Sequence, residues 1–209
     1  KALPMKISIL TQTKDNWSHE YLKTEFIKNR HQVEFVDPLA MAMCTDQISI
    51  GQANKFNDKH VDKFFKKTDL VLGRFGIPSN SYGIALLRHF EAKKIPTINT
   101  SWATQMARDK WASLQIFSSR NLPIPKTFYW DRTKSPQEVL NHELLQKIPF
   151  RKVVIKALNG SQGRGVFLAT THAQAKQILS QWPPNKDCLN QDYLIQEYIE
   201  ESKGQDVRA

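Results

Sequence analysis

One short segment constrains the fold of this chain more than any other: an apolar run at residues 153–156 ends in Lys156 and precedes a glycine-rich stretch at residues 160–166. Three glycines in six residues let backbone N–H groups approach an anion without a Cβ in the way. Lys156 adds a positive charge beside them, and a serine adds a hydroxyl donor. The segment predicts a phosphate-binding loop built from Gly160, Ser161, Gln162, Gly163 and Gly165.

The spacing of these glycines excludes the two common nucleotide-binding patterns. They run G-x-x-G-x-G, whereas a Rossmann fingerprint needs G-x-G-x-x-G before a helix and a P-loop needs Lys-Ser/Thr directly after its last glycine. The apolar residues 166–168 predict a second strand, so we expect the loop at the tip of a hairpin that acts as a flap. An ordinary glycine-containing turn between two strands is the alternative interpretation.

Length and composition indicate a globular chain. Its 209 residues, 40% of them hydrophobic, suffice for one large domain or two small ones. No apolar run approaches the roughly 18 residues that a membrane-spanning helix needs, so no membrane partner is expected. Cys44 and Cys188 lie far apart without metal-ligand spacing, which argues against a disulfide scaffold or a zinc site. A reducing, cytoplasmic setting fits this cysteine usage.

The formal net charge of +10 raises the hypothesis of a nucleic-acid binder. The basic residues are scattered, however, and the densest groups, at residues 55–67 and 147–156, are interrupted by acids or apolar residues. The same positive field attracts nucleotides and acidic substrates. We therefore expect ATP and an acidic substrate rather than nucleic acid as partners.

The first half of the chain alternates strand and helix patterns. Residues 1–4 resemble a leader, and strands are expected at 5–10, 33–36, 70–72 and 97–98, with helices at 17–29, 61–65 and 82–93. Such alternation predicts a parallel sheet covered by helices. Arg88 and Glu91 lie three apart on the last of these helices, a spacing typical of an intrahelical ion pair.

A domain change is expected near Asn99, where the pattern becomes mixed. Helices are predicted at residues 107–120, from Ser135 to about residue 147, and at 171–181, and strands at 126–130 and 193–198 besides the hairpin. The start at Ser135 is well marked, because proline follows it and Glu138 lies at the third helical position.

Two further segments extend the predicted phosphate site. Lys110 begins a helix ahead of the hairpin and offers a second ammonium group. A strand beyond the hairpin ends in Gln196-Glu197, whose backbone groups suit an adenine edge and whose carboxylate suits a ribose hydroxyl or the ordering of a lysine.

Taken together, these segments resemble the ATP-grasp superfamily, most closely the RimK-type glutamate and amino-acid ligases. The resemblance covers nearly the whole sequence and depends on residues 5–10, 82–83, 87–91, 98–99, 108–110, 122–125, 154–156, 160–166, 196–199 and 204–208. It implies an α/β chain: a Rossmann-like pre-ATP-grasp domain at 5–98, the central ATP-grasp domain at 99–188, and the start of a truncated carboxy-terminal lobe at 189–209.

The resemblance also implies roles for individual residues. Lys110 and Lys156 would contact phosphates, and Asp206 would lie on the nucleotide side of the cleft. Arg208 would act catalytically, toward phosphate or acceptor substrate. The adenine-binding hinge would comprise Gln196, Glu197, Tyr198 and Ile199.

The chemistry of that family is ATP-dependent amide-bond formation. ATP activates a carboxylate as an acyl phosphate, an amine such as that of glutamate attacks it, and phosphate leaves; the acceptor would be an acidic peptide or small molecule. The protein mainly positions groups and neutralises charge, so no protein nucleophile is required. The sequence agrees, since none of its six histidines lies in a triad-like motif.

The sequence departs from the family at its end. In relatives the segment after the position of Arg208 continues into a lobe with an Asp and a later Glu-x-Asn that hold Mg²⁺; the sequence stops at Ala209. We therefore expect no metal ligands in this chain, with those for Mg²⁺ downstream, and an isolated 209-residue piece that is inactive as a ligase. A non-catalytic nucleotide-binding or interaction module is the alternative hypothesis. The oligomeric state, the acceptor and the added amino acid stay open.

Overall fold

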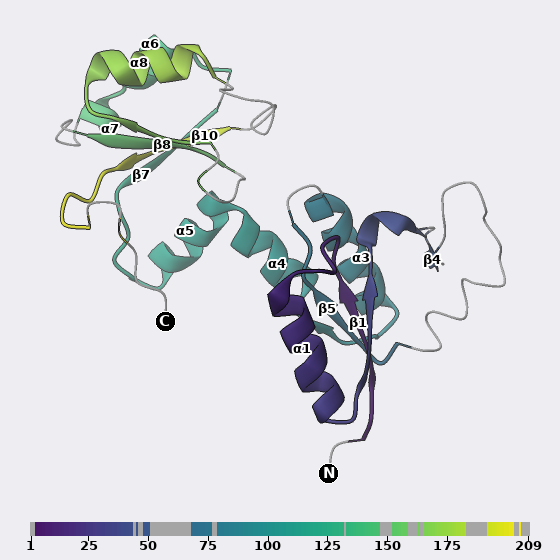
Figure 1. Ribbon diagram of the computed structural model, residues 1–209. Helices are drawn as coiled ribbons and strands as arrows, with labels where there is room; N and C mark the ends of the chain where they lie inside the picture. The colour runs from purple at the N-terminus through teal and green to yellow at the C-terminus, as the bar shows by residue number, and fades with distance from the viewer. Residues whose placement is uncertain are drawn as a thin grey trace. The chain divides into compact units, whose positions relative to one another are not determined.

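The chain divides into two units, Lys1–Gln105 and Met106–Ala209, which the computed structural model in Figure 1 shows coloured by sequence position. The structure describes residues 3–43, 45, 48–50, 68–76, 79–131, 133–146, 152–158, 163, 165–182, 192–202 and 205. The predicted helix at residues 61–65 lies outside these ranges.

The first unit is built on a four-stranded parallel sheet in the order β2-β1-β5-β6. Its strands are β1 (Lys6–Leu10), β2 (Gln32–Val36), β5 (Leu70–Gly73) and β6 (Thr97–Ile98), and its longest helices are α1 (Trp17–Lys28) and α3 (Asn80–Ala92). Because β1 pairs with β2 on one side and with β5 on the other, the chain reverses its direction of winding after β2. The predicted Rossmann-like α/β class is confirmed.

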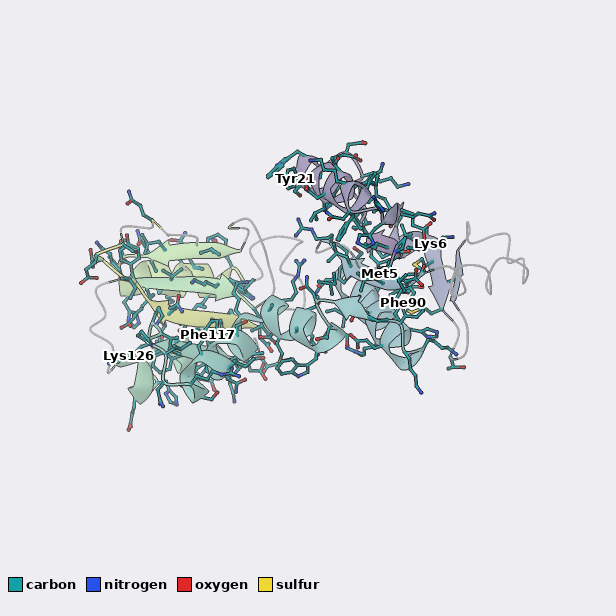
Figure 2. All side chains as sticks on the ribbon, turned by 90° about the horizontal axis from the view of Figure 1, so that it is seen from below. Met5, Lys6, Tyr21, Phe90, Phe117 and Lys126 are labelled. Atoms are coloured by element: carbon teal, nitrogen blue, oxygen red, sulfur yellow. The ribbon has the colours of Figure 1, made fainter. Side chains whose placement is uncertain are left out.

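Alternation along β1 divides the core of this unit between the two faces of its sheet. Ile7 and Ile9 pack with Leu22 and Phe26 of α1, while Leu10 belongs to a cluster that includes Val71 of β5 and Leu86, Leu87 and Phe90 of α3. The two helices therefore cover opposite faces. Tyr21 of α1, labelled in Figure 2, is 62% exposed and takes no part in either cluster.

A short hairpin follows β2, in a part of the chain where the sequence analysis expects no strand. The 3₁₀ turn η1 (Pro38–Ala40) leads into β3 (Met41–Met43), which pairs antiparallel with β4 (Ile48–Ile50). The Tyr82 hydroxyl of α3 donates to the Met41 carbonyl at 2.6 Å, which ties the hairpin to this helix. Three-residue strands carry too little alternation to be predicted from sequence.

The second unit has a four-stranded antiparallel sheet in the order β7-β10-β8-β9. The strands are β7 (Thr127–Trp130), β8 (Val153–Ala157), β9 (Val166–Ala169) and β10 (Tyr193–Glu197). Helices α6 (Pro136–Leu140) and α8 (His172–Ser180) lie over one face of this sheet (Figure 1), where Ile155 and Ile195 join the core with Leu140 and Leu179. Strand alternation therefore places Lys156 and Gln196 on the opposite face.

Of two helices predicted in this half of the chain, one is confirmed and the other is divided in the structure. The helix expected at residues 107–120 corresponds to α5 (Lys110–Ser119), and Lys110 begins it as expected, because the Asp109 carboxylate accepts the N–H groups of Trp111 and Ala112; α4 (Ser101–Arg108) is a separate helix before it. Ser135 and Glu138 form the predicted capping box. Their helix α6 stops at Leu140, however, and α7 (Glu143–Gln146) follows as a separate turn, so the single helix expected to about residue 147 is wrong.

Candidate functional site

The predicted hairpin is confirmed: β8 and β9 pair antiparallel, with Lys156 opposite Val166. Ala157 N–H donates to the Gly165 carbonyl at 2.8 Å, and Val166 N–H donates to that of Gly163 at 3.2 Å. Gly163 and Gly165 have φ angles of +73° and +74°, which residues with a Cβ rarely adopt. A Cβ on Gly163 would meet no heavy atom within 4 Å. Glycine is therefore required there by backbone conformation and not by lack of space.

Lys156 is held by a glutamine on the neighbouring strand. Its Nζ donates to Gln196 Oε1 at 2.5 Å, and Gln196 Nε2 donates to Thr127 Oγ1 at 2.7 Å. Gln196 is only 8% exposed, so its amide occupies a defined place in the sheet. Partial burial lowers the pKa of the Lys156 amine. The charged form of this lysine thus depends on the hydrogen bonds it makes.

Lys110 reaches the same end of β8 from the start of α5. Its Nζ donates to the carbonyls of Ala157 at 2.8 Å and Leu158 at 3.2 Å. These carbonyls belong to the last residue of β8 and the next residue in the chain. The structure therefore brings the two predicted phosphate-binding lysines to the strand end that leads into the glycine loop.

Glu197 hydrogen-bonds to the main chain of Lys126, the residue just before β7. Its Oε1 accepts the Lys126 N–H at 2.8 Å, and its own N–H donates to the Lys126 carbonyl at 2.9 Å. The carboxylate thus fixes the chain entering β7 to the end of β10. Of the two sequence hypotheses for this carboxylate, the ordering of a lysine side chain is not what the structure shows.

The two residues after β10 also have defined surroundings. Tyr198 N–H donates to the Lys152 carbonyl at 3.3 Å, and the Lys152 ammonium lies 5.5 Å from the centre of the Tyr198 ring. Ile199 is 38% exposed, and its carbonyl accepts the Ser202 hydroxyl at 3.0 Å. The expected hinge, residues 196–199, therefore starts in the sheet and ends at the surface.

A pocket of about 500 Å³ lies between α5 and the segment that enters β7. Trp111 and Leu114 of α5 line it together with Pro125, Lys126 and Thr127; Figure 2 labels Lys126. The sequence offers no signal for this pocket, because it forms between two segments that were assigned separately to a helix and a strand.

The sequence also gives no signal for a polar contact between Tyr129 and Asp192. The Tyr129 hydroxyl donates to the Asp192 carboxylate, and the Trp111 ring lies 5.6 Å from that of Tyr129. The hydrogen bond to Asp192, followed by burial and the charge of Asp192, raises the pKa of Tyr129 to about 12.

Several predicted site residues cannot be placed. Gly160, Ser161, Gln162, Asp206 and Arg208 lie outside the described residues. Within the described ranges, no group of three or more His, Cys, Asp or Glu side chains is arranged to hold a metal ion. Nor does any described helix combine the length and apolar character needed to cross a membrane.

Family models match both halves of the chain. Residues 5–104 match the RimK PreATP-grasp domain, and residues 107–209 match the RimK-like ATP-grasp domain. Among curated proteins, a probable alpha-L-glutamate ligase of Legionella pneumophila (strain Corby) is 33% identical over 205 residues, and one of Vibrio atlanticus is 32% identical over 205 residues. Each alignment covers 98% of this chain and 63% of the relative, so the chain spans somewhat under two thirds of their length.

Solved structures share the fold at low sequence identity. A RimK domain ATP-grasp protein from Sphaerobacter thermophilus DSM 20745 has a TM-score of 0.66 and 17% identity, over 93% of this chain and 64% of that one. The D-alanyl-alanine synthetase A of Vibrio cholerae has a TM-score of 0.60 and 14% identity, over 95% and 61%. These similarities extend across both units.

Proposed function

Because the chain belongs to the RimK-type ATP-grasp family, through its pre-ATP-grasp and ATP-grasp domains, we propose that it serves an ATP-dependent carboxylate–amine ligase. The ligase adds glutamate or a similar amino acid to an acidic peptide or small-molecule acceptor. The observation that carries the proposal is the convergence of Lys110 and Lys156 at the end of β8, beside a hairpin with two left-handed glycines.

In this proposal the chain's own groups bind and neutralise a triphosphate. The ammonium groups of Lys110 and Lys156 meet phosphate oxygens, and the backbone N–H groups of the loop, with the Ser161 hydroxyl, close over them. The adenine edge lies against residues 196–199. Asp206 lies on the nucleotide side of the cleft, and Arg208 contacts phosphate or acceptor.

The reaction proposed for the whole protein forms one amide bond. ATP supplies the phosphoryl group that converts the acceptor carboxylate into an acyl phosphate, with ADP as leaving group. The amine nitrogen of the incoming amino acid then attacks the activated carbon, loses a proton, and displaces phosphate. The role of the chain is to position these groups and to screen their charge.

Magnesium enters the proposal only as the ion that accompanies ATP in the whole protein. The described residues do not provide a site that fits it, so no step is assigned to it here. The domain roles are part of the same proposal: pre-ATP-grasp at 5–98, central ATP-grasp at 99–188, and the start of the carboxy-terminal lobe at 189–209. Two widely separated cysteines support a reducing, cytoplasmic setting.

Equilibrium dialysis of the 209-residue chain with labelled ATP tests nucleotide binding. Lys156→Ala removes an ammonium group at the loop, so we expect its affinity for ATP to fall about tenfold or more. Lys176→Ala is the matched control, because Lys176 is exposed on α8, over the other face of the sheet. Equal ATP binding by Lys156→Ala and the unchanged chain would remove the proposed site.

Two further outcomes separate the proposal from its competitors. ATP binding without ligation of glutamate by the whole protein, supplied with acidic acceptors, would favour a non-catalytic nucleotide-binding module. Retention of single-stranded or duplex nucleic acid in place of ATP, with a steep dependence on salt, would favour a nucleic-acid binder.

A further inference from the structure

Three hydrogen bonds run in a line across the face of the second sheet that carries Lys156. Lys156 Nζ donates to Gln196 Oε1 at 2.5 Å, Gln196 Nε2 donates to Thr127 Oγ1 at 2.7 Å, and Thr127 Oγ1 donates to the Pro125 carbonyl at 2.9 Å. Strand register explains the line, because Gln196 of β10 pairs with Thr127 of β7 on one side. On its other side it pairs with Val154 of β8, two residues before Lys156.

Donor and acceptor chemistry fixes the direction of each bond. An ammonium group only donates, so the Gln196 oxygen must face Lys156 and the amide nitrogen must face Thr127. The Thr127 hydroxyl then accepts from that nitrogen, and its own proton goes to Pro125, a residue that offers only a carbonyl. A reversal of the Gln196 amide would point its N–H groups at the ammonium, and Thr127 disfavours that reversal.

Because the Gln196 amide is buried, its orientation affects the Lys156 ammonium strongly. Gln196 is 8% exposed and Lys156 is partly buried, so water cannot freely replace a lost hydrogen bond. The charged groups on neighbouring elements are engaged elsewhere: Lys110 of α5 binds the Ala157 and Leu158 carbonyls, and Glu197 of β10 binds the Lys126 N–H. Among the described residues, no carboxylate lies within ion-pair distance of Lys156.

We propose that Thr127 is a positioning residue that acts through the Gln196 amide to hold the Lys156 ammonium ready for a phosphate-bearing ligand. That Lys156 contacts nucleotide phosphate rests on the proposed function; the coupling from Thr127 to Lys156 does not. Thr127 lies 29 residues before Lys156 in the sequence and outside every segment expected to bind nucleotide, so only the sheet register reveals its role.

The first test needs no nucleotide. Lys156 is acetylated competitively in the folded chain over a range of pH, and its rate is compared with that of exposed Lys176 by mass spectrometry. Thr127→Val keeps the β-branched shape but removes the hydroxyl. The ammonium then loses its oriented acceptor, and burial favours the neutral, reactive amine more strongly. We expect the relative rate at Lys156 to rise about threefold to tenfold at mildly alkaline pH.

Matched variants separate coupling from a general structural effect. Thr127→Ser restores the hydroxyl and is expected to react like the unchanged chain, and Thr24→Val removes a hydroxyl in the first unit. A change in access alone alters the maximal labelling rate, whereas loss of the acceptor moves the midpoint of the pH profile downward. If Thr127→Val does not fold, as judged by circular dichroism, Thr127→Ala answers the same question.

An unchanged midpoint in the folded valine or alanine variant would overturn the proposal. ATP titration of the same proteins distinguishes the coupling of Thr127 to Lys156 from the proposed contact of Lys156 with ATP. A loss of ATP affinity of about threefold to tenfold in Thr127→Val, with rescue in Thr127→Ser, supports both. If the unchanged chain binds no ATP, the proposed function fails, while the labelling profile still decides whether Thr127 controls Lys156.

Discussion

The carboxylate of Glu91 accepts two hydrogen bonds from Ser101, at 2.7 Å from its backbone N–H and at 2.6 Å from its hydroxyl. Thr97 donates a third at 2.9 Å. One side chain at the end of α3 thus joins β6 to the first residue of α4. Arg88 donates to Gln105 at 3.0 Å, and of the expected Arg88–Glu91 pair the structure shows the effect of the Arg88 charge, which helps to lower the pKa of Glu91.

We expect Glu91→Gln to destabilise the first unit by about 1 kcal/mol at neutral pH. The amide keeps the shape but loses the charge that strengthens the three hydrogen bonds, and partial exposure to water limits the loss. Urea unfolding monitored by circular dichroism measures the difference. Glu201→Gln, at an exposed position in the second unit, is the control and should change stability little.

The hydrogen bonds to the Glu91 carboxylate also predict that the stability of the first unit depends on pH. Partial burial by itself raises the pKa of Glu91, but the hydrogen bonds from Ser101 and Thr97 outweigh it, so the pKa lies below its usual value. This stabilisation is therefore present above about pH 4.3, the ordinary pKa of glutamate, and is lost as pH falls through the lower folded value. The stability gap between Glu91→Gln and the unchanged chain should close in that acidic range. A gap of the same size at neutral and strongly acidic pH would contradict this account.

Gly83 of α3 is expected to tolerate no side chain. A Cβ at this position would lie 2.6 Å from three atoms of the buried Phe75 ring. Alanine normally gains about 1 kcal/mol over glycine within a helix, but overpacking here should reverse that gain and destabilise the first unit by about 1–3 kcal/mol. Thermal unfolding of Gly83→Ala and of the unchanged chain measures this loss of stability. Adding Phe75→Leu should recover part of the loss, and additive losses would argue against a direct clash.

Tyr129 and Tyr193 are the two of the five tyrosines expected to ionise late: burial raises the pKa of Tyr193, and Tyr129 has a different cause. Its hydrogen bond to Asp192, with burial and the charge of that carboxylate, raises the pKa to about 12. Asp192→Asn should return it toward about 10, the ordinary value. Because the folded pKa is raised, the associated stability is present below about pH 10 and lost as pH rises through the folded value. Ultraviolet titration of tyrosinate detects the change, and identical curves for the two proteins would exclude the coupling.

Sequence patterns predict the helices and strands in which apolar and polar side chains follow a regular period. The buried strands β1, β5 and β8 and the helices α1, α3 and α8 follow from apolar spacing, and the hairpin follows from glycines between two apolar runs. The break between α6 and α7 does not, because Leu140 and Leu144 keep a helical spacing of four residues across it.

Some residues of the candidate site can likewise be identified from the sequence, and others cannot. Lys156 is identifiable because a lysine beside a glycine loop carries a local signal, whereas Lys110 is identified only through the resemblance to the family. Thr127, Tyr129 and Asp192 carry none, since each acquires its contact from strand pairing across long stretches of sequence. Pairing register depends on the packing of the whole sheet.

The Lys110 ammonium donates to two main-chain oxygens at the end of β8. A lysine that is mobile in water gives up about 1.5–2 kcal/mol of rotamer freedom when a ligand immobilises it. Here folding has already imposed most of that order. In the proposed function, phosphate binding at Lys110 exchanges one oxygen acceptor for another, so little further rotamer freedom is lost.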